Sequence, residues 1–407
     1  MTKQRIQVGD FPIGPEEKAA VRAVLDSGRI SEGKATKEFE KRWARYIGTK
    51  YAVAVNSGTS ALIAGLLALI HDGRFKKVRP GAKVITSPVT YIATSNAIKL
   101  AGMEPVYVDI NKHDFTLKCD EIEDLLEKEN AKEYAAILPV HLMGYPNDMD
   151  RLKKIAHKYD LVIFEDSAQA HGTLYRGKKT GSLSLLSDFS FYIAHNIQAG
   201  EMGVVNTDDE KIYKLIKKIK ANGRLCDCVE CLRYKGRCKY GKGDEMFERD
   251  PRFTHDLIGY NFKTTEFQTA LASAQMKRAD RIFKSRSDNV KYLNDSLEKF
   301  SDLLQLPVFS PDVSYLGYPM VIKQPGRISR KAFSSRLEKH GIETRPLFGC
   351  IPTQQPAYSE YRETYRKRLP NADFIGANGL YIGCHQYLKK EDLDYVVSTI
   401  EKAIKES

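Results

Sequence analysis

Four of the seven cysteines lie close together, in the pattern C-x-C-x2-C-x6-C. They are Cys226, Cys228, Cys231 and Cys238. Four thiolates in one segment suit either Zn²⁺ or an iron–sulfur cluster. The N-terminal sequence MTKQRIQVGDFPIG lacks the apolar core of a secretory signal peptide, so we expect a cytoplasmic protein whose clustered cysteines bind metal rather than form disulfides. The spacing alone favours structural zinc.

A second candidate site lies in the segment VNSGTSAL, residues 55–62, where a predicted strand meets a predicted helix. Ser57, Gly58 and Thr59 stand at the start of that helix, where free backbone N–H groups and a hydroxyl can bind a phosphate. The alternative is that Ser57 only caps the helix.

A carboxylate follows the apolar strand in VIFEDSAQAHG, residues 162–172. Asp166 in this position can keep a pyridinium nitrogen protonated, which makes the ring an electron sink. Gln169 can hydrogen-bond a substituent of the same ring. The alternative is a solvated carboxylate at the end of a strand.

Short β-rich runs alternate with helical stretches through the first two-thirds of the chain. The predicted strands are 51–55, 83–86, 105–108, 135–139, 162–165, 188–192 and 203–206, and predicted helices include 59–70, 95–100, 119–127 and 148–159. This alternation predicts an α/β fold with a large, mostly parallel sheet between helices. Ligands of such sheets bind at the carboxyl ends of the strands, where the candidate residues stand.

The last third predicts a smaller α/β domain. A long helical pattern runs from about 265 to 300, followed by a strand at 317–321 and helices near 329–340 and 390–405. We therefore expect a large cofactor-binding domain, 1–280, with the cysteine segment as an insertion at about 222–245, and a small C-terminal domain, 281–407.

The composition excludes several classes of protein. The chain of 407 residues has a formal charge of +12, but its Lys and Arg residues are dispersed among Asp and Glu, so we expect no nucleic-acid partner. The longest apolar run, Ala61–Ile70, is too short to span a membrane. A phosphorylated small substrate explains the net positive charge better than a nucleic acid or a membrane does.

The third segment, SDFSFYIAHNIQAGEMGVV at 187–205, together with the two above, resembles the fold-type I, pyridoxal-phosphate-dependent sugar aminotransferase family (DegT/DnrJ/EryC/StrS). TYIAT at 90–94, PVHLMGYPNDMD at 139–150 and GYNFKTTEFQTALASAQM at 259–276 extend the resemblance over nearly the whole chain. It implies an aspartate-aminotransferase-like fold, a ring-stacking Tyr91, a cofactor contact at Ser190, and Asn261 reaching the phosphate of a partner subunit in a homodimer with shared active sites.

The family attaches its cofactor through a lysine in a pattern like S-F-x-x-x-K, and here His195 occupies that position after Ser190 and Phe191. No lysine occurs from 180 to 210. Because imidazole forms no stable imine, the resemblance implies a non-covalently held cofactor, pyridoxamine 5′-phosphate (PMP), with His195 as a proton-transfer base. Such a site favours dehydration over amino transfer. The alternative is an inactive homologue.

Four more segments, NGRLCDC, DLIGYNFKTTEFQ, SYLGYP and TRPLFGCIPTQQPAY, resemble one branch of the family. This branch is the PMP- and [2Fe–2S]-dependent 3-dehydratases of nucleotide-linked 4-keto-6-deoxyhexoses, the CDP-ascarylose-pathway type. The resemblance implies a cluster on the four cysteines, electrons from a flavin/iron–sulfur reductase, and a nucleotide-sugar substrate.

The last cysteine spacing and the stretch EDSAQAHG differ from that branch. Two alternatives therefore stay open: a cluster-independent PMP dehydratase regenerated by glutamate, and a zinc-stabilised non-catalytic homologue. Arg345 is either a substrate contact or one half of a structural salt bridge.

Overall fold

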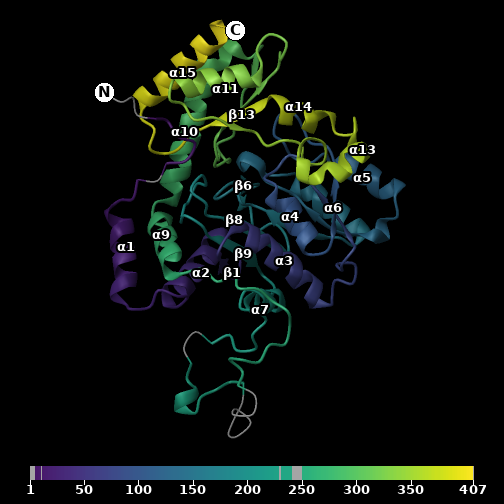
Figure 1. Ribbon diagram of the computed structural model, residues 1–407, viewed down its shortest axis with the longest axis vertical. Helices are drawn as coiled ribbons and strands as arrows, with labels where there is room; N and C mark the ends of the chain where they lie inside the picture. The colour runs from purple at the N-terminus through teal and green to yellow at the C-terminus, as the bar shows by residue number, and fades with distance from the viewer. Residues whose placement is uncertain (1–4, 11, 229–230, 241–249, 407) are drawn as a thin grey trace.

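A seven-stranded sheet forms the centre of the larger part of the molecule (Figure 1). The computed structural model describes residues 5–10, 12–228, 231–240 and 250–406. The strands, in spatial order, are β1 (Tyr51–Val55), β9 (Gly203–Thr207), β8 (Leu186–Ser190), β5 (Val162–Asp166), β4 (Tyr134–Leu138), β2 (Lys83–Thr86) and β3 (Glu104–Tyr107). β9 is antiparallel to both its neighbours, and the other described pairs are parallel, so the expected mixed, mostly parallel sheet is confirmed.

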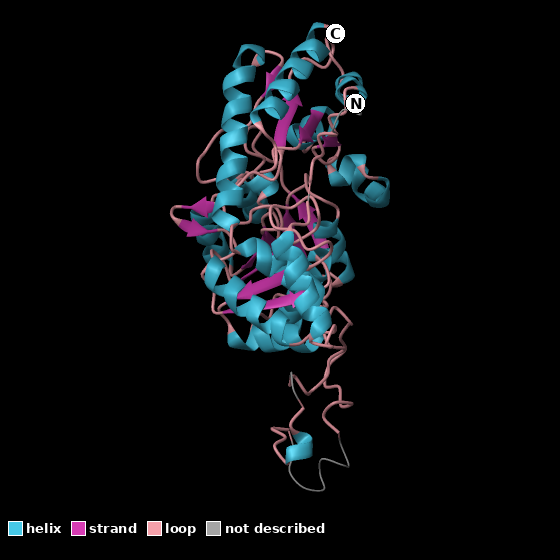
Figure 2. Ribbon diagram, turned by 90° about the vertical axis from the view of Figure 1, so that its left-hand side faces the viewer, coloured by secondary structure: helices cyan, strands magenta, loops and turns pink. Residues whose placement is uncertain are grey.

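Helices cover both faces of this sheet, as Figures 1 and 2 show. One face packs on α3 (Gly58–Asp72), α4 (Ala93–Leu100) and α7 (Glu210–Ile219). The other face packs on α2 (Lys34–Ile47), α5 (Cys119–Lys128), α6 (Met149–Tyr159) and α9 (Glu266–Met276). The packing follows the alternation of the strands, because successive side chains point to opposite faces.

Several helix boundaries follow from local chemistry. Ser57 caps α3 by accepting a hydrogen bond from the backbone N–H of Ser60 at 3.1 Å. Asp148 caps α6 through Arg151 in the same way. α2 ends at Gly48, whose φ of 98° suits the left-handed conformation that stops a helix.

The prediction of one long helix from 265 to 300 is wrong. The chain forms α9 and then α10 (Ala279–Leu297), with Arg278 between them at φ −124° and ψ 20°. Arg278 forms ion pairs with Glu16 and Glu17 in the first turn of α1 (Pro15–Asp26), so a contact distant in sequence accompanies the break.

A four-stranded sheet, in the order β10-β11-β13-β12, forms the smaller part. Its strands are β10 (Leu304–Gln305), β11 (Tyr318–Ile322), β13 (Gly379–Ile382) and β12 (Arg345–Pro346). The helices of the C-terminal third are α11 (Arg330–Lys339), α12 (Ile351–Gln354), α13 (Arg362–Tyr365), α14 (Pro370–Asn378) and α15 (Lys390–Lys405). The remaining short elements are β6 (Leu174–Tyr175), β7 (Lys178–Lys179) and the 3₁₀ turns η1 (Ala131–Glu133), η2 (Leu142–Gly144), η3 (Arg233–Lys235), η4 (Glu298–Phe300) and η5 (Pro356–Tyr361).

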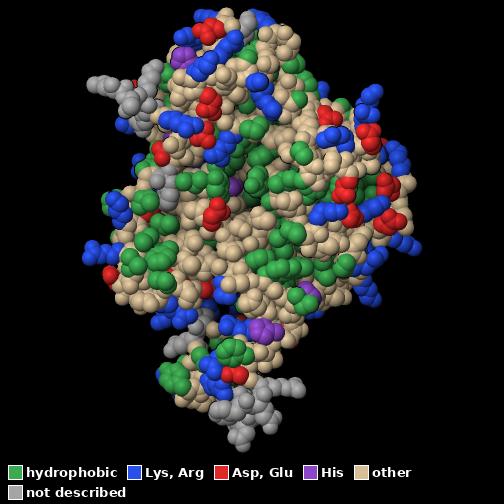
Figure 3. All heavy atoms as spheres, in the orientation of Figure 1, with side chains coloured by type: hydrophobic (Ala, Val, Ile, Leu, Met, Phe, Trp, Pro, Cys, Tyr) green, Lys and Arg blue, Asp and Glu red, His purple; other side chains and the backbone are tan. Residues whose placement is uncertain are grey.

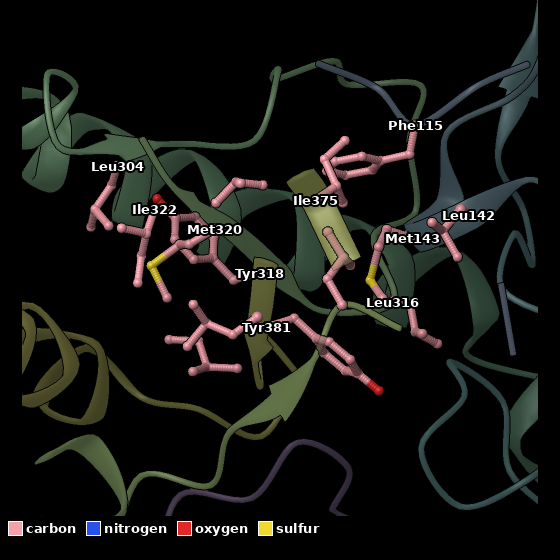
Figure 4. Close-up of a cluster of buried hydrophobic side chains, with 14 of the residues drawn as sticks. Phe115, Leu142, Met143, Leu304, Leu316, Tyr318, Met320, Ile322, Ile375 and Tyr381 are labelled. Atoms are coloured by element: carbon pink, nitrogen blue, oxygen red, sulfur yellow. The ribbon is translucent and has the colours of Figure 1, made fainter. Parts of the chain in front are cut away.

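The core of the smaller part includes residues from the first half of the chain. Figure 4 shows Phe115, Leu142 and Met143 beside Leu316 and Ile375 in one buried cluster. The N-terminal segment also joins this part, through a bridge between Ile6 and Ile342. The two sheets are thus held by a shared apolar core, and a domain boundary at residue 280 stays a prediction.

The segment after α7 projects away from the body of the molecule (Figures 1 and 2). It carries the four clustered cysteines and η3. Residues 229–230 and 241–245 of the expected insertion lie outside the described residues, as do 1–4 and 11 of the N-terminal sequence. No helix in the described part of the chain is long and apolar enough to cross a membrane.

Candidate active site

The start of α3 forms a cradle lined by backbone. A Cβ added at Gly58 would lie 2.7 Å from Cβ of Ser190, and one at Gly203 would lie 2.2 Å from the carbonyl oxygen of Ser57. Only glycine therefore fits at these two positions. The structure brings together Ser57, Gly58 and Ser190, from the two segments that sequence analysis singled out, with Thr59 next in the helix. Free N–H groups at this helix start can bind a phosphate.

Asp166 ends β5 and is almost fully buried. Its carboxylate accepts hydrogen bonds from the hydroxyl of Thr94 at 2.8 Å and the backbone N–H of Ala168 at 3.2 Å. Burial raises the pKa of Asp166, whereas these two donors and the nearby His141 act to lower it. A buried carboxylate held in one orientation is suited to pairing with a protonated ring nitrogen.

A hydrogen bond to the backbone holds the side chain of Gln169 in place. The Gln169 side-chain oxygen accepts a hydrogen bond from the backbone N–H of Met143 at 2.9 Å, which leaves its amide group to donate. Met143 sits in the shared core, so this core fixes the orientation of Gln169.

The Tyr91 ring is 61% exposed and packs edge-on against Phe348, with ring centroids 6.2 Å apart. Tyr91 thus presents a free ring face for stacking.

His195 lies in the turn after β8. Its backbone N–H donates to the carbonyl of Tyr192 at 2.8 Å, and its Nδ1 is buried with no hydrogen-bond partner among the described residues. Burial lowers the pKa of His195 to about 4, and the positive charges of Arg286 and Arg345 act in the same direction. The imidazole is therefore neutral at pH 7, with a nitrogen available to accept a proton.

Asn261 is exposed and lines a cavity of about 420 Å³ that opens at the surface. The neighbouring Phe262 accepts a backbone hydrogen bond from Asn56, next to the start of α3, at 2.8 Å. Lys37 and Lys263 also line this cavity, as does Lys220, which pairs with Glu32 and Glu40. Desolvation and neighbouring cations lower the pKa of both Lys37 and Lys263, so this exposed face is suited to an anion.

Comparisons with known proteins identify the family and the fold. The model of the DegT/DnrJ/EryC1/StrS aminotransferase family matches residues 12–401. The chain belongs to this family. It is therefore an enzyme of the pyridoxal-phosphate-dependent, sugar-modifying class with the fold-type I architecture. The expected family and the expected fold are both confirmed.

Relatives in this family differ in activity. The chain is 32% identical to dTDP-4-dehydro-2,6-dideoxy-D-glucose 3-dehydratase of Saccharopolyspora spinosa, covering 98% of this chain and 88% of that protein. It is 29% identical to GDP-perosamine synthase of Caulobacter vibrioides, covering 98% of each. A solved GDP-4-keto-6-deoxymannose-3-dehydratase with a trapped PLP–glutamate geminal diamine has a TM-score of 0.84 at 28% identity, covering 97% of this chain and 100% of that one.

The residues present fit the family's cofactor. The glycine-lined cradle can hold its phosphate, and Asp166 is a buried carboxylate for its ring nitrogen. Several buried polar atoms here lack a partner among the described residues, including Nδ1 of His195 and Nε2 of His171. Such atoms are costly unless a ligand or water satisfies them.

The four cysteines do not form a ligand set in the described residues. There, no three His, Cys, Asp or Glu side chains are placed to hold a metal ion. Cys226 is buried, Cys231 is exposed, and Cys228 has its pKa raised by burial and by a hydrogen bond with Cys226. The metal predictions, iron–sulfur or zinc, therefore gain no support from the structure, and Cys238 is only partly buried.

Arg345 forms the salt bridge that sequence analysis kept as an alternative. Its Nε lies 3.0 Å from a carboxylate oxygen of Glu343. Its charge still acts on His195, so Arg345 stands near the candidate base.

Sequence reasoning missed three residues of this site: Thr94, which orients Asp166; His171, whose ring is stacked on His195 with centroids 6.1 Å apart; and Asp188. Thr94 and His171 lie inside segments already noted, but nothing in their spacing assigns them a partner. Asp188 stands two residues before Ser190, so strand alternation could have placed both on one face.

Proposed function

We propose that the protein is a PMP-dependent 3-dehydratase of a nucleotide-linked 4-keto-6-deoxyhexose. The observation that carries this proposal is His195, with its unpartnered Nδ1, at the position where the family pattern has lysine. The nearest lysines in the sequence are engaged elsewhere. Lys179 lies over the ring of Tyr46, and Lys211 pairs with Asp72.

In this proposal, the residues of the pocket bind the cofactor and stabilise the charge on its ring nitrogen. Backbone N–H groups at the start of α3, with the Ser57 and Ser190 hydroxyls, would hold the phosphate. Asp166 keeps the ring nitrogen protonated, and Thr94 fixes the carboxylate in place. When bound, PMP supplies an amine that condenses with the sugar ketone and a ring that accepts electrons.

His195 moves the proton. Its neutral imidazole would take a proton from C4′ of the cofactor, and the resulting imidazolium would return it to the C3 hydroxyl as that group leaves. A positioned base of this kind contributes roughly 10²–10⁴-fold to a rate. The pKa of about 4 makes His195 a weak base in the protein alone. Negative charge from a bound phosphate raises that pKa toward neutrality, so the base is strengthened when the cofactor is present.

A homodimer completes the site in this proposal. The Asn261 segment is exposed in the single chain, and exposed apolar side chains accompany it: Ile258 is 84% exposed and Tyr260 is 41% exposed. Figure 3 shows hydrophobic side chains gathered on one face around α3 and α1, where a second subunit can pack. The basic cavity beside Asn261 suits the diphosphate of a nucleotide sugar.

The cysteine segment is proposed to hold a [2Fe–2S] cluster that passes electrons from a flavin/iron–sulfur reductase. What supports this is position: Cys226 and Cys228 line the same cavity as Asn261. If Asn261 contacts the cofactor of the partner subunit, the cysteines of one subunit stand near the active site of the other. Assembly of the ligand set then requires Cys231 and Cys238 to move toward that pair on metal binding.

Two experiments test the proposal. Anaerobically purified protein is analysed for iron, sulfide and zinc, and its reduced form is examined by EPR. Iron with sulfide and a reduced-cluster signal supports the relay. Stoichiometric zinc, or no metal, contradicts it and favours regeneration by glutamate. Separately, PMP-loaded protein incubated with a nucleotide-linked 4-keto-6-deoxyhexose and a low-potential one-electron reductant should release a 3-deoxy product. A 4-amino sugar as the sole product would make the protein an aminotransferase and refute the dehydratase proposal.

A further inference from the structure

Asp188 on β8 is fully buried, yet neither of its carboxylate oxygens has a hydrogen-bond partner among the described residues. An isolated buried carboxylate is unfavourable unless it is paired, hydrogen-bonded or protonated. The mechanism above does not use Asp188, so its presence needs a separate explanation.

The geometry of β8 places Asp188 on the same face of the strand as Leu186 and Ser190. Leu186 and Ser190 both face α3: Cδ1 of Leu186 lies 3.0 Å from a Cβ added at Gly65, and Cβ of Ser190 lies 2.7 Å from one added at Gly58. Because side chains alternate along a strand, Asp188 points to the same face, between these two contacts.

Asp166 is the neighbour of Asp188 across the sheet. The two residues are register partners on the parallel strands β5 and β8, which lie about 4.8 Å apart, so their side chains share one face. On the other side, the register partner of Asp188 is the apolar Val205 of β9. The charged group that acts on Asp188 is thus Asp166, and no cation stands opposite it on either strand.

The charge around Asp188 favours a proton on its carboxyl group. Burial and the negative charge of Asp166 raise the pKa of Asp188 well above its ordinary value. The cofactor phosphate, held beside Ser190 two residues along the strand, would repel a second negative charge. Asp166 already has two donors, Thr94 and Ala168, which favour its charged form.

We propose that Asp188 is a second carboxyl group of the cofactor site, which stays protonated and donates a hydrogen bond to the Asp166 carboxylate. This positioning residue stabilises the charged form of Asp166 and so moderates how tightly the ring nitrogen holds its proton. The inference deepens the proposed function and rests on it for the location of the cofactor ring.

Infrared difference spectroscopy of the PMP-loaded protein tests the proton directly, because PMP has no carbonyl group of its own. The wild-type-minus-D188N spectrum at pH 7 should contain the C=O stretch of a protonated carboxyl group, shifted in D₂O. Ser187→Ala is the matched control, since the Ser187 hydroxyl bonds Gly181 on the opposite face of β8. The absence of this band from the wild type, or its persistence in D188N, would overturn the proposal.

The second measurement is the ¹⁵N chemical shift of ring-labelled PMP as a function of pH. Asp188→Ala removes the donor to Asp166, so the protonation midpoint of the ring nitrogen should rise by about one pH unit. D188N, whose amide still donates, should stay near the wild-type midpoint. An unchanged midpoint in D188A, or a lower one, would show that Asp188 is structural or ionised. Neither experiment needs turnover, so failure of the dehydratase proposal would not be mistaken for failure of this one.

Discussion

Replacing His195 with asparagine should separate proton transfer from cofactor binding. Burial lowers the pKa of His195 to about 4 in the protein alone, so the imidazole is a neutral base at pH 7, and the substitution removes this base. A general base contributes roughly 10²–10⁴-fold, and the exchange of the C4′ proton of PMP should slow by at least about 100-fold. Binding of PMP should change little, because the groups proposed to hold the cofactor, the start of α3 and the Asp166 carboxylate, stay in place.

The assay is hydrogen exchange at C4′, followed by NMR in D₂O with PMP and a 4-keto sugar, beside calorimetric measurement of the PMP dissociation constant. Exposed His113, replaced by asparagine, is the matched control and should match the wild type in both measurements. Exchange in His195→Asn within about tenfold of the wild type would assign the base to another residue and refute the reasoning. Loss of PMP binding instead would make His195 a binding residue.

Three further changes test the surroundings of the site. A Cβ at Gly203 would lie 2.2 Å from a backbone carbonyl at the start of α3. Gly203→Ala should therefore lower the free energy of unfolding in urea by about 1–3 kcal/mol and weaken PMP binding. Gly326→Ala is the control and should change neither quantity, because the space around Gly326 is open. Thr94→Val removes a charge-assisted hydrogen bond and raises the pKa of Asp166, so calorimetry should find PMP binding roughly tenfold weaker. Burial lowers the pKa of His385 to about 3, so below pH 6.5 the unfolded chain binds a proton that the folded protein does not. The free energy of unfolding should therefore fall by up to about 1.4 kcal/mol per pH unit below pH 6.5. His385→Asn should reduce this pH dependence, as measured by urea unfolding. An unchanged slope in that variant would place the titrating groups elsewhere.

Most strands of the large sheet could be predicted, since they are short β-rich runs bounded by turn residues, although β8 (LSDFS) begins two residues before the predicted strand 188–192. The small sheet was harder, because two of its strands, β10 and β12, have only two residues each. Such short pairings form through neighbours that are distant in the chain. The break between α9 and α10 is likewise accompanied by a distant contact, because Arg278 pairs with a helix more than 250 residues away in the sequence.

The sequence by itself determined which chemical groups are available to the site. These are a histidine where the family has lysine, a carboxylate after a buried strand, and a turn of small residues at the start of a helix. These features are local, and residue type with neighbouring pattern is enough to recognise them. The tertiary structure alone decided which groups meet. It set Thr94 against Asp166, stacked His171 on His195 and aligned Asp188 with Asp166. Those pairings depend on strand register and on packing between distant segments, and neither is encoded in the spacing of any one segment.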